Sequence, residues 1–556
     1  MVEVNVSELL VDKFKEKNVK FVFGILSSGF VELGDILYDT DIKYVGARHE
    51  QWAGHMADAA GRLMGKPQIF LVPGGPGVTN GVTAIKTANI NHSPMFVLSD
   101  GSTMGVSGKM DFQDIDGTSI TARVAKHSQT VHSPDRVEEY FSWLYNIALT
   151  PLTGPVHLEV PRDILLMKTN YVKNLNASCP VYNSYPSEET VSDVIKIILQ
   201  SSKPIIVAGE EINNETGREF LNKFVNELYI PVCAVHNNND VMDNESVYML
   251  GALGRLGSAI AMEALHRADV ILALGTNMNP YTFSPYYGFK YNDITNNIIQ
   301  VTLDSSNINR NFTTSKSLVC NPVEFLEVAV KILKNGNLNS KAPGFKNWFN
   351  SINRKDPPIF KGKYNNMVFE TLFNIIPSKS IISLDAGSMS MVMLKWRKFG
   401  KSCRLLSSGN MGEVGFSISS AIGASLAKPG APSFAFLGDG SFTMQMSALI
   451  TAVEYNIPIK AIVFDNGAWG SEKAYQETLY NNRLFGSVLK NPDIAEVAKS
   501  LGVTSFRATD LTSLVLGLKD LDNSKEPSLL VINMENDFPT PVRSLDVVKR
   551  AYRGIY

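Results

Sequence analysis

The sequence has few cysteines and no long hydrophobic run, and each absence excludes a class of protein. Its four cysteines are widely separated and include no C-x-x-C pair, so we expect neither a disulfide framework nor a cysteine-ligated zinc site. No stretch of about eighteen apolar residues occurs, which argues against a membrane-spanning helix. These absences predict a protein of the reducing cytoplasmic compartment.

The chain also lacks an excess of charge of either sign. It has 52 Lys and Arg against 54 Asp and Glu, a formal net charge of −2, and this balance argues against a nucleic-acid partner. With 556 residues, of which 44% are hydrophobic, it is long enough for roughly two to four domains with substantial cores. Its opening, MVEVNVSELLVDKFKEK, is predicted to be an amphipathic helix rather than a signal peptide.

Two polar, proline-bearing stretches divide the chain and are the expected linkers, at Lys168–Glu188 and Asn335–Asn366. They leave three blocks, at 1–170, 186–336 and 364–556. Each block alternates short apolar runs with segments of helical spacing, which favours an α/β fold. We therefore predict three doubly wound domains with parallel sheets.

The third block contains the stretch with the clearest chemistry. The run Ser433–Leu437 is short and apolar, as expected for a buried parallel strand, and Gly438-Asp439-Gly440 is predicted to form a turn. A helix is expected from Ser441, and Pro458 precedes a second strand at 459–464. This order predicts a strand, helix, strand unit.

Asp439 and Asn466 follow the ends of these two strands, at the edge where open α/β sheets bind ligands. An aspartate oxygen and an amide oxygen are hard donors that suit Mg²⁺, which often also binds phosphate. The helix that begins after Gly440 offers free N–H groups to that phosphate. The alternative is an ordinary turn in which Asp439 only caps a helix.

In the first block, Glu50 follows a predicted strand at 42–45 and stands beside the start of a helix. A zinc-protease H-E-x-x-H motif fails, because Ala53 stands where the second histidine is required. The alternative is that Glu50 is a capping carboxylate.

Two further loops contain residues that could bind a ligand, a glycine-rich one at 73–81 and a polar one at His236. In the loop at 73–81, Asn80 stands where a dinucleotide-binding G-x-G-x-x-G motif requires glycine, so its glycines are expected to permit close approach of another ligand. In the second block, His236 and the asparagines after it are interpreted as a solvated turn.

The GDG sequence at 438–440 is followed by 25 residues and then by Asn466. This spacing resembles the cofactor motif of the thiamine-diphosphate enzymes. The three-block order resembles in particular the family of acetolactate synthase, pyruvate oxidase and sulfoacetaldehyde acetyltransferase, over nearly the whole chain. Further segments carry the resemblance: HEQWAGHMADAAGR at 49–62, GGPGVTN at 74–80, FQDID at 112–116, GPVHLEVPRD at 154–163, GALGRLGS at 251–258 and GNMGEVGFSISSAIGA at 409–424.

The resemblance implies a role for each matching residue. Glu50 would bond the cofactor's pyrimidine nitrogen and so promote loss of the thiazolium proton, and Gln113 would lie near the reacting centre. Asp439, Asn466 and the Ala468 carbonyl would bind Mg²⁺. The other implied cofactor-binding residues are Gly387 and Ser388 at the diphosphate, Gly412 and Val414 at the pyrimidine, and Gly438, Gly440 and Ser441 in the GDGS turn.

In such enzymes Glu50 and the metal site face each other across two subunits, which implies a homodimer or homotetramer acting on a small carbonyl substrate. The implied activity is acetolactate-synthase-like: decarboxylation of a small 2-oxo acid such as pyruvate and transfer of the two-carbon unit. Asn277 and Met278 stand where acetolactate synthases carry arginines that meet flavin, which makes a bound flavin (FAD) doubtful.

Two alternatives stay open. Segments 273–291 and 466–485 look most like sulfoacetaldehyde acetyltransferase, which makes acetyl phosphate and sulfite from sulfoacetaldehyde and phosphate. Asp111 and Asn277 depart from that pattern, and Tyr475 departs from the tryptophan of many acetolactate synthases. The other alternative is a non-catalytic, cofactor-binding regulatory homologue, which would have less need of Glu50.

Overall fold

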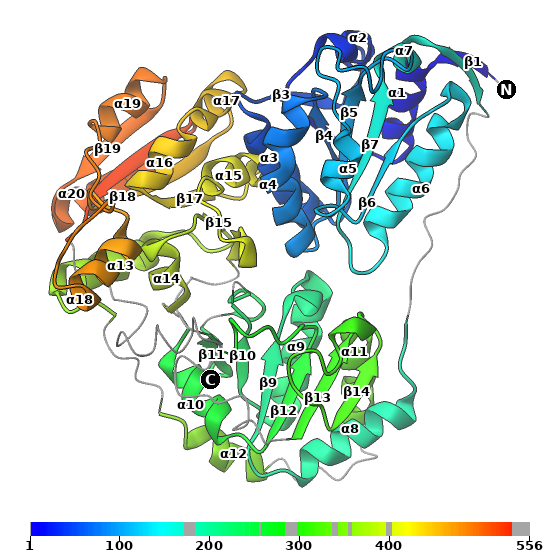
Figure 1. Cartoon of the computed structure of the whole chain (residues 1–556). Coiled ribbons are helices and arrows are strands. Elements are labelled where there is room, and N and C mark those ends of the chain that lie inside the picture. The colour runs from blue at the N-terminus through cyan, green and yellow to red at the C-terminus, as the bar shows by residue number, and fades with distance from the viewer. Residues whose placement is uncertain are drawn as a thin grey trace.

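The described part of the chain contains three six-stranded parallel sheets, each flanked by helices, and one small two-stranded sheet (Figure 1). The computed structural model describes residues 2–171, 184–236, 238–243, 245–254, 257–283, 297–335, 343–353, 359–395 and 403–535. The predicted α/β class with three doubly wound parallel sheets is confirmed. We refer to the three parts as the N-terminal, central and C-terminal units.

The N-terminal unit has the strand order β3-β2-β4-β5-β7-β6. Its strands are β2 (Phe21–Gly24), β3 (Lys43–Gly46), β4 (Gln68–Val72), β5 (Met95–Gly101), β6 (His127–Thr130) and β7 (Pro155–Pro161). Its helices are α1 (Val6–Glu16), α2 (Val31–Tyr38), α3 (Glu50–Met64), α4 (Pro76–Ile90), α5 (Gly117–Thr121), α6 (Val137–Leu149) and α7 (Arg162–Leu166).

The central unit has a different order, β11-β10-β9-β12-β13-β14. Its strands are β9 (Pro204–Ala208), β10 (Val232–Ala234), β11 (Met249–Ala252), β12 (Val270–Leu274), β13 (Asn297–Thr302) and β14 (Lys316–Val319). Its helices are α8 (Glu188–Gln200), α9 (Glu215–Leu228), α10 (Ala259–Arg267), α11 (Pro322–Lys334) and α12 (Pro343–Asn350).

The C-terminal unit has the order β16-β15-β17-β18-β20-β19, which repeats the topology of the N-terminal unit. Its strands are β15 (Ile381–Leu384), β16 (Arg404–Ser407), β17 (Ser433–Gly438), β18 (Ile459–Asp465), β19 (Thr504–Ala508) and β20 (Ser528–Asn533). Its helices are α13 (Lys363–Ile375), α14 (Ser388–Lys395), α15 (Ser417–Ala427), α16 (Asp439–Gln445), α17 (Ala448–Glu454), α18 (Gly470–Leu479), α19 (Ile494–Ser500) and α20 (Leu511–Asn523).

The N-terminal and C-terminal units share one hydrophobic core along α3 and α15, which lie side by side (Figure 1). Trp52 and Met56 of α3 are buried in the same cluster as Ile418 and Ile422 of α15. At Gly423, a Cβ atom would lie 2.2 Å from the Met56 carbonyl oxygen, so only glycine permits this approach. The two units therefore pack as one body around the pair of helices.

Local predictions fail at both ends of the N-terminal block. Residues Val2–Asn5 form strand β1, which pairs antiparallel with β8 (Lys168–Tyr171), so the predicted linker begins after β8 and not at Lys168. Helix α1 starts at Val6 because Asn5 caps it, in a capping box with Glu8. The rest of the predicted linker as far as residue 183 lies outside the described residues.

The loop expected at 73–81, the turn expected at 438–440 and the helix expected from Ser441 have other bounds in the structure. The loop expected at 73–81 ends at Gly75, since Pro76 is the first residue of α4, a position that suits proline. Asp439 and Gly440 are not a turn but the first residues of α16, and the helix expected from Ser441 is two helices. In the first turn of α17 the amides of Leu449 and Ile450 bond carbonyls three residues earlier, at Met446 and Ser447, so the backbone is more tightly wound where α17 begins.

Within the described ranges, no helix combines the length and apolarity that crossing a membrane would need. Three of the four cysteines fall in these ranges, namely Cys233, Cys320 and Cys403, and they are buried and free.

Candidate functional site

A cavity of about 720 Å³ lies at the carboxyl ends of β15, β16, β17 and β18. The strand order reverses between β15 and β17, which is where open parallel sheets bind ligands. The cavity brings together all the cofactor and metal residues predicted for the third block: Gly387, Ser388, Gly412, Val414, Gly438, Asp439, Gly440, Ser441, Asn466 and Ala468.

Three acidic residues line this cavity, Asp385, Asp439 and Glu472, and Asp439 is only 1% exposed. Burial, together with the negative charge of nearby Asp465, raises the pKa of Asp439 to about 6. Its Oδ2 accepts a hydrogen bond of 2.7 Å from the side-chain amide of Asn491. A buried carboxylate of this kind is stabilised by a nearby cation, so the donor set around Asp439 fits a hard metal ion.

Two features of the cavity wall leave room for a polar ligand. Gly438 has an ordinary φ of −83° and no atom within 4 Å of the place where a Cβ would lie, so neither backbone strain nor protein packing requires glycine there. The hydroxyl of Ser388 is buried and has no hydrogen-bond partner among the described residues. Both observations fit a ligand that lies against this backbone.

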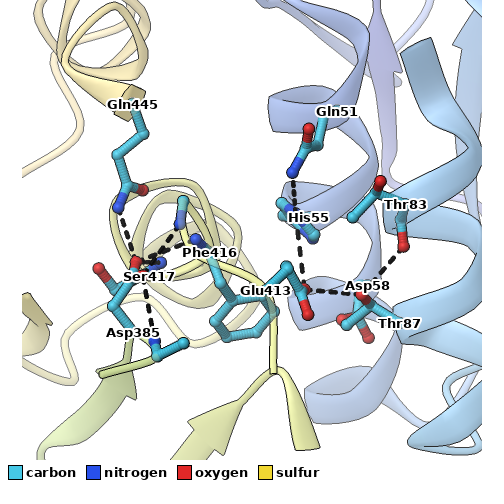
Figure 2. A network of polar contacts seen from close by, with 12 residues as sticks. Gln51, His55, Asp58, Thr83, Thr87, Asp385, Glu413, Phe416, Ser417 and Gln445 are labelled. Atoms are coloured by element: carbon cyan, nitrogen blue, oxygen red, sulfur yellow. Dashed lines mark hydrogen bonds and ion pairs between the residues drawn. The ribbon is translucent and has the colours of Figure 1, made fainter. Parts of the chain in front are cut away.

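Asp385, just after β15, fixes the wall that includes Gly412 and Val414 (Figure 2). Its carboxylate accepts hydrogen bonds of 2.9, 2.9 and 2.8 Å from the backbone amides of 415, 416 and 417, at the start of α15. It also accepts one of 2.6 Å from the Gln445 side chain. Because these four donors converge on one carboxylate, the segment before α15 is held in a defined position.

Glu50 does not line this cavity. It is the first residue of α3 and is 8% exposed, and its carboxylate accepts a hydrogen bond of 3.0 Å from the Asn80 side chain. The helix cap is His49, whose Nδ1 accepts from the amide of Gln51. The capping alternative for Glu50 is therefore replaced by a cap at His49.

Gln113 also lies outside the cavity, in the N-terminal unit. It has a φ of 60°, which is unusual for a residue other than glycine. Its side-chain oxygen accepts a hydrogen bond of 2.5 Å from Arg162, and Arg162 also bonds the buried Asp100 at 2.9 Å. The structure thus holds Gln113 in a fixed position, apart from the residues that line the cavity.

The central unit contributes two cavity residues that the sequence did not indicate, His236 and Tyr281. Their rings meet edge to face with centroids 4.7 Å apart. The Nδ1 atom of His236 is buried without a hydrogen-bond partner among the described residues, and burial lowers its pKa to about 4. The prediction that His236 lies in a solvated turn is therefore wrong. The only sequence signal for its place in the cavity was the run of polar residues after β10.

The loop that carries His236 is tied to the C-terminal unit. Asp240 accepts hydrogen bonds of 2.9 Å from Arg404 and 3.0 Å from the amide of Leu405, both on β16. The side-chain amide of Asn239 donates to the Leu394 carbonyl at the end of α14. These bonds hold the central unit against the cavity wall.

The corresponding crevice of the central sheet lies between the ends of β9 and β12 and is occupied by an acidic side chain. Glu211 accepts hydrogen bonds from the amide of Leu303 and the hydroxyl of Thr302. Burial raises the pKa values of Glu210 and Glu211 to about 7. Two buried carboxyl groups therefore lie beside the carboxyl ends of the central strands.

Three family models match the chain in order. They are the N-terminal TPP binding domain of thiamine pyrophosphate enzymes at residues 4–120, the central domain at 191–328 and the C-terminal TPP binding domain at 385–532.

Proteins similar to this chain include acetolactate synthase large subunits and sulfoacetaldehyde acetyltransferases. A probable acetolactate synthase large subunit of Methanococcus aeolicus is 28% identical over 95% of this chain and 91% of its own length. An acetolactate synthase large subunit of Buchnera aphidicola subsp. Schizaphis graminum is 27% identical over 96% and 94%. A sulfoacetaldehyde acetyltransferase of Alcaligenes xylosoxydans xylosoxydans is 26% identical over 89% and 87%.

Proposed function

The chain belongs to the thiamine pyrophosphate (thiamine diphosphate) enzymes, and on this premise we propose that it is a Mg²⁺-dependent enzyme that cleaves and forms C–C bonds beside a carbonyl. The proposed reaction is acetolactate-synthase-like: decarboxylation of a small 2-oxo acid such as pyruvate and transfer of the two-carbon unit. The observation that carries the proposal is the convergence of Asp439, Asn466 and the glycine loops on one cavity.

In this proposal the C-terminal unit holds the diphosphate end of the cofactor. Asp439, Asn466 and the Ala468 carbonyl bind Mg²⁺, which suits oxygen donors and bridges to phosphate. Ser388 supplies its unpartnered hydroxyl, and Gly387 and the 438–441 segment bring backbone N–H groups close. Gly412 and Val414 contact the pyrimidine ring, and Asp385 keeps them in place through the start of α15.

When bound, thiamine pyrophosphate supplies a thiazolium carbon that adds to the substrate carbonyl. Glu50 is proposed to exchange a proton with the pyrimidine nitrogen, a general acid–base role that suits a shielded carboxyl group. Asn80 orients that carboxylate through its hydrogen bond. Gln113, held by Arg162, is proposed to contact the reacting substrate.

Glu50 lies outside the cavity of its own chain, so we propose that the complete site forms between two copies, as a homodimer or homotetramer. The three units are proposed to be domains near the predicted bounds 1–170, 186–336 and 364–556, except that α12 extends the central domain, because Phe345 and Trp348 pack in its cores. Each family model lies within one of these ranges. A flavin is not proposed, because Asn277 and Met278 stand where the resemblance to acetolactate synthases expects arginines that contact flavin.

The second candidate is sulfoacetaldehyde acetyltransferase activity, which the similarity to such an enzyme over most of the chain favours. The part of segment 273–291 beyond Phe283 lies outside the described residues. Among the described residues that line the cavity, no arginine or lysine is present to bind a sulfonate. A carboxylate and a sulfonate are both anions, so the assay below decides between the two substrates.

One assay distinguishes the two. Purified protein with Mg²⁺ and thiamine pyrophosphate is given pyruvate alone, or sulfoacetaldehyde with phosphate, and acetolactate, acetaldehyde, acetyl phosphate and sulfite are measured. We expect carbon dioxide release and a two-carbon transfer product from pyruvate. Acetyl phosphate and sulfite with no turnover of pyruvate would establish the second candidate instead.

A further inference from the structure

Glu413 stands between Gly412 and Val414 but does not line the cavity. Its side chain is only 9% exposed and points to the N-terminal unit, where it meets α3 and α4 (Figure 2). It therefore connects the wall proposed to hold the pyrimidine ring with a helix of another unit. No motif in the sequence indicated this contact.

The number of hydrogens available at this contact favours a proton on Glu413. The hydroxyl oxygen of Thr87 lies 3.0 Å from the Thr83 carbonyl and 2.6 Å from Oε1 of Glu413. A threonine hydroxyl has one hydrogen, and a carbonyl oxygen can only accept. A protonated Glu413 carboxyl that donates to Thr87 leaves the threonine hydrogen for the Thr83 carbonyl, so each contact is then a full two-centre hydrogen bond. An ionised Glu413 would have to share that one hydrogen with the carbonyl.

The surroundings of Glu413 favour the protonated form. The nearest basic group is His55 of α3, with its Nε2 3.8 Å from Oε1, and burial lowers the pKa of His55 to about 4, so it is uncharged at neutral pH. Arg62 of α3 is committed to Asp58, with two hydrogen bonds of 2.8 and 2.6 Å. No cation in these contacts neutralises an ionised Glu413.

Other charges act in the same direction. Burial raises the pKa of Glu413 to about 7, and the negative charges of Asp58 and Asp385 act in the same direction. A hydrogen bond donated by Thr87, which would favour the ionised carboxylate, acts against this shift. Helix α4 contributes the uncharged Thr87 to the contact. The second carboxyl oxygen of Glu413, Oε2, is buried without a hydrogen-bond partner among the described residues. An ionised carboxylate would therefore be poorly solvated here.

We propose that Glu413 is a positioning residue whose proton fastens the Gly412–Val414 segment to α4, and that its ionisation loosens this segment and weakens the binding of thiamine pyrophosphate. The inference rests on the function proposed above, since it assigns a pH-dependent control to the same site. Glu413 touches neither substrate nor cofactor in this scheme. It acts through the backbone of its two neighbours.

The test is the dissociation constant of thiamine pyrophosphate, measured by calorimetry in saturating Mg²⁺ between pH 6 and pH 8 for wild type and Glu413→Gln. The glutamine amide donates to Thr87 at every pH, whereas Glu413 does so only when protonated. If the ionised form does not bind, the ratio of the wild-type to the variant constant rises about tenfold from pH 6 to pH 8. Groups that titrate in both proteins cancel in this ratio, so a ratio that stays constant overturns the proposal.

Thr87→Val gives an independent test if Glu413→Gln folds poorly. This variant lacks the acceptor for the proton, so we expect weaker binding than wild type at pH 6 and similar binding at pH 8. Thr83→Val, which keeps the carbonyl and removes a hydroxyl one turn away, is the matched control and should bind as wild type does.

A Thr87→Val effect that is equal at both pH values, or absent at both, would contradict the proposal. Failure of the wild type to bind thiamine pyrophosphate at any pH would contradict the proposed function instead.

Discussion

The N-terminal and C-terminal units have the same strand order and differ in what fills the equivalent edge of the sheet. In the C-terminal unit the loops after β15 and β17 surround a cavity that contains Asp439. In the N-terminal unit the loop after β4 is closed by protein groups, since the amide of Gly74 donates to Asp100, which also bonds Ser27 and Arg162. One topology thus supports a ligand cavity after β15 and β17 in one unit and a loop held by protein hydrogen bonds after β4 in the other.

Because the two sheets share one strand order, the different roles proposed for the two units depend on the loops after the strands. Glu50 follows β3, and the Gly412–Val414 segment follows β16, the equivalent strand in the other sheet. The helices after them, α3 and α15, pack together (Figure 1). We infer that the two units divide the work: the C-terminal unit binds the cofactor, and the N-terminal unit presents the carboxyl group that activates it.

Glu50→Gln is expected to have the largest effect. Glutamine keeps an oxygen for the bond from Asn80 but cannot exchange the proton, so turnover should fall by about 10²–10⁴-fold while the cofactor still binds. Turnover of the accepted substrate and calorimetric binding of thiamine pyrophosphate are measured on the same preparation. Unchanged turnover would contradict the role of Glu50 and favour the regulatory, non-catalytic alternative.

Asp439→Ala should give the opposite pattern, a loss of binding. Removal of a direct metal ligand is expected to weaken cofactor binding in Mg²⁺ by at least about 100-fold. Asp439→Asn, which keeps one oxygen donor and the bulk of the side chain, should lie between the alanine variant and wild type. Cofactor affinity that is equal in all three proteins would remove Asp439 from the metal site.

Glu413→Gln tests the contact that joins the two units. Because the pKa of Glu413 is raised from 4.5 to about 7, the folded chain keeps this proton at pH values where the unfolded chain releases it. The stability that the proton contributes is fully present below pH 4.5 and is lost as the pH rises to about 7. Glutamine does not titrate, so the stability of the variant relative to wild type should increase by up to about 3 kcal/mol between pH 5 and pH 8.

Urea unfolding of both proteins at the two pH values measures this change. A stability difference that does not vary with pH would show that Glu413 does not hold a proton in the folded chain.

Two glycines give the smallest effects and compare the two sheet edges directly. A Cβ at Gly24, the last residue of β2, would lie 2.1 Å from the Leu71 carbonyl oxygen, whereas one at Gly438 meets nothing within 4 Å. Gly24→Ala should therefore lower the free energy of unfolding by about 1–3 kcal/mol. Gly438→Ala should leave stability unchanged and weaken cofactor binding by about tenfold, or about 1.4 kcal/mol.

Thermal unfolding and calorimetric titration of both glycine variants provide the check. The comparison between the two units fails if Gly438→Ala destabilises the fold and leaves the cofactor affinity unchanged.

The buried inner strands could be predicted from sequence, since each is a short apolar run that glycine or a polar residue ends. Edge strands such as β6, β14 and β19 could not, because they are polar and only partly buried. Asp439 and Asn466 could be found in the same way, because a ligand at the end of a strand is a local feature. His236 and Glu413 could not, since their neighbours come from other units. The pairing of Val2–Asn5 with Lys168–Tyr171 was missed for the same reason, as it joins residues at opposite ends of the unit.

The central claim is that each complete site combines Glu50 of one chain with the Asp439 metal site of another. Mixing two inactive variants tests this claim most directly. Glu50→Gln and Asp439→Ala chains with different affinity tags are co-expressed, the mixed oligomer is isolated, and its turnover is compared with that of each variant alone. Random assortment into dimers restores one intact site in every mixed dimer, so the unfractionated mixture should reach about a quarter of wild-type activity. Mixed oligomers with no more turnover than the separate variants would contradict the claim.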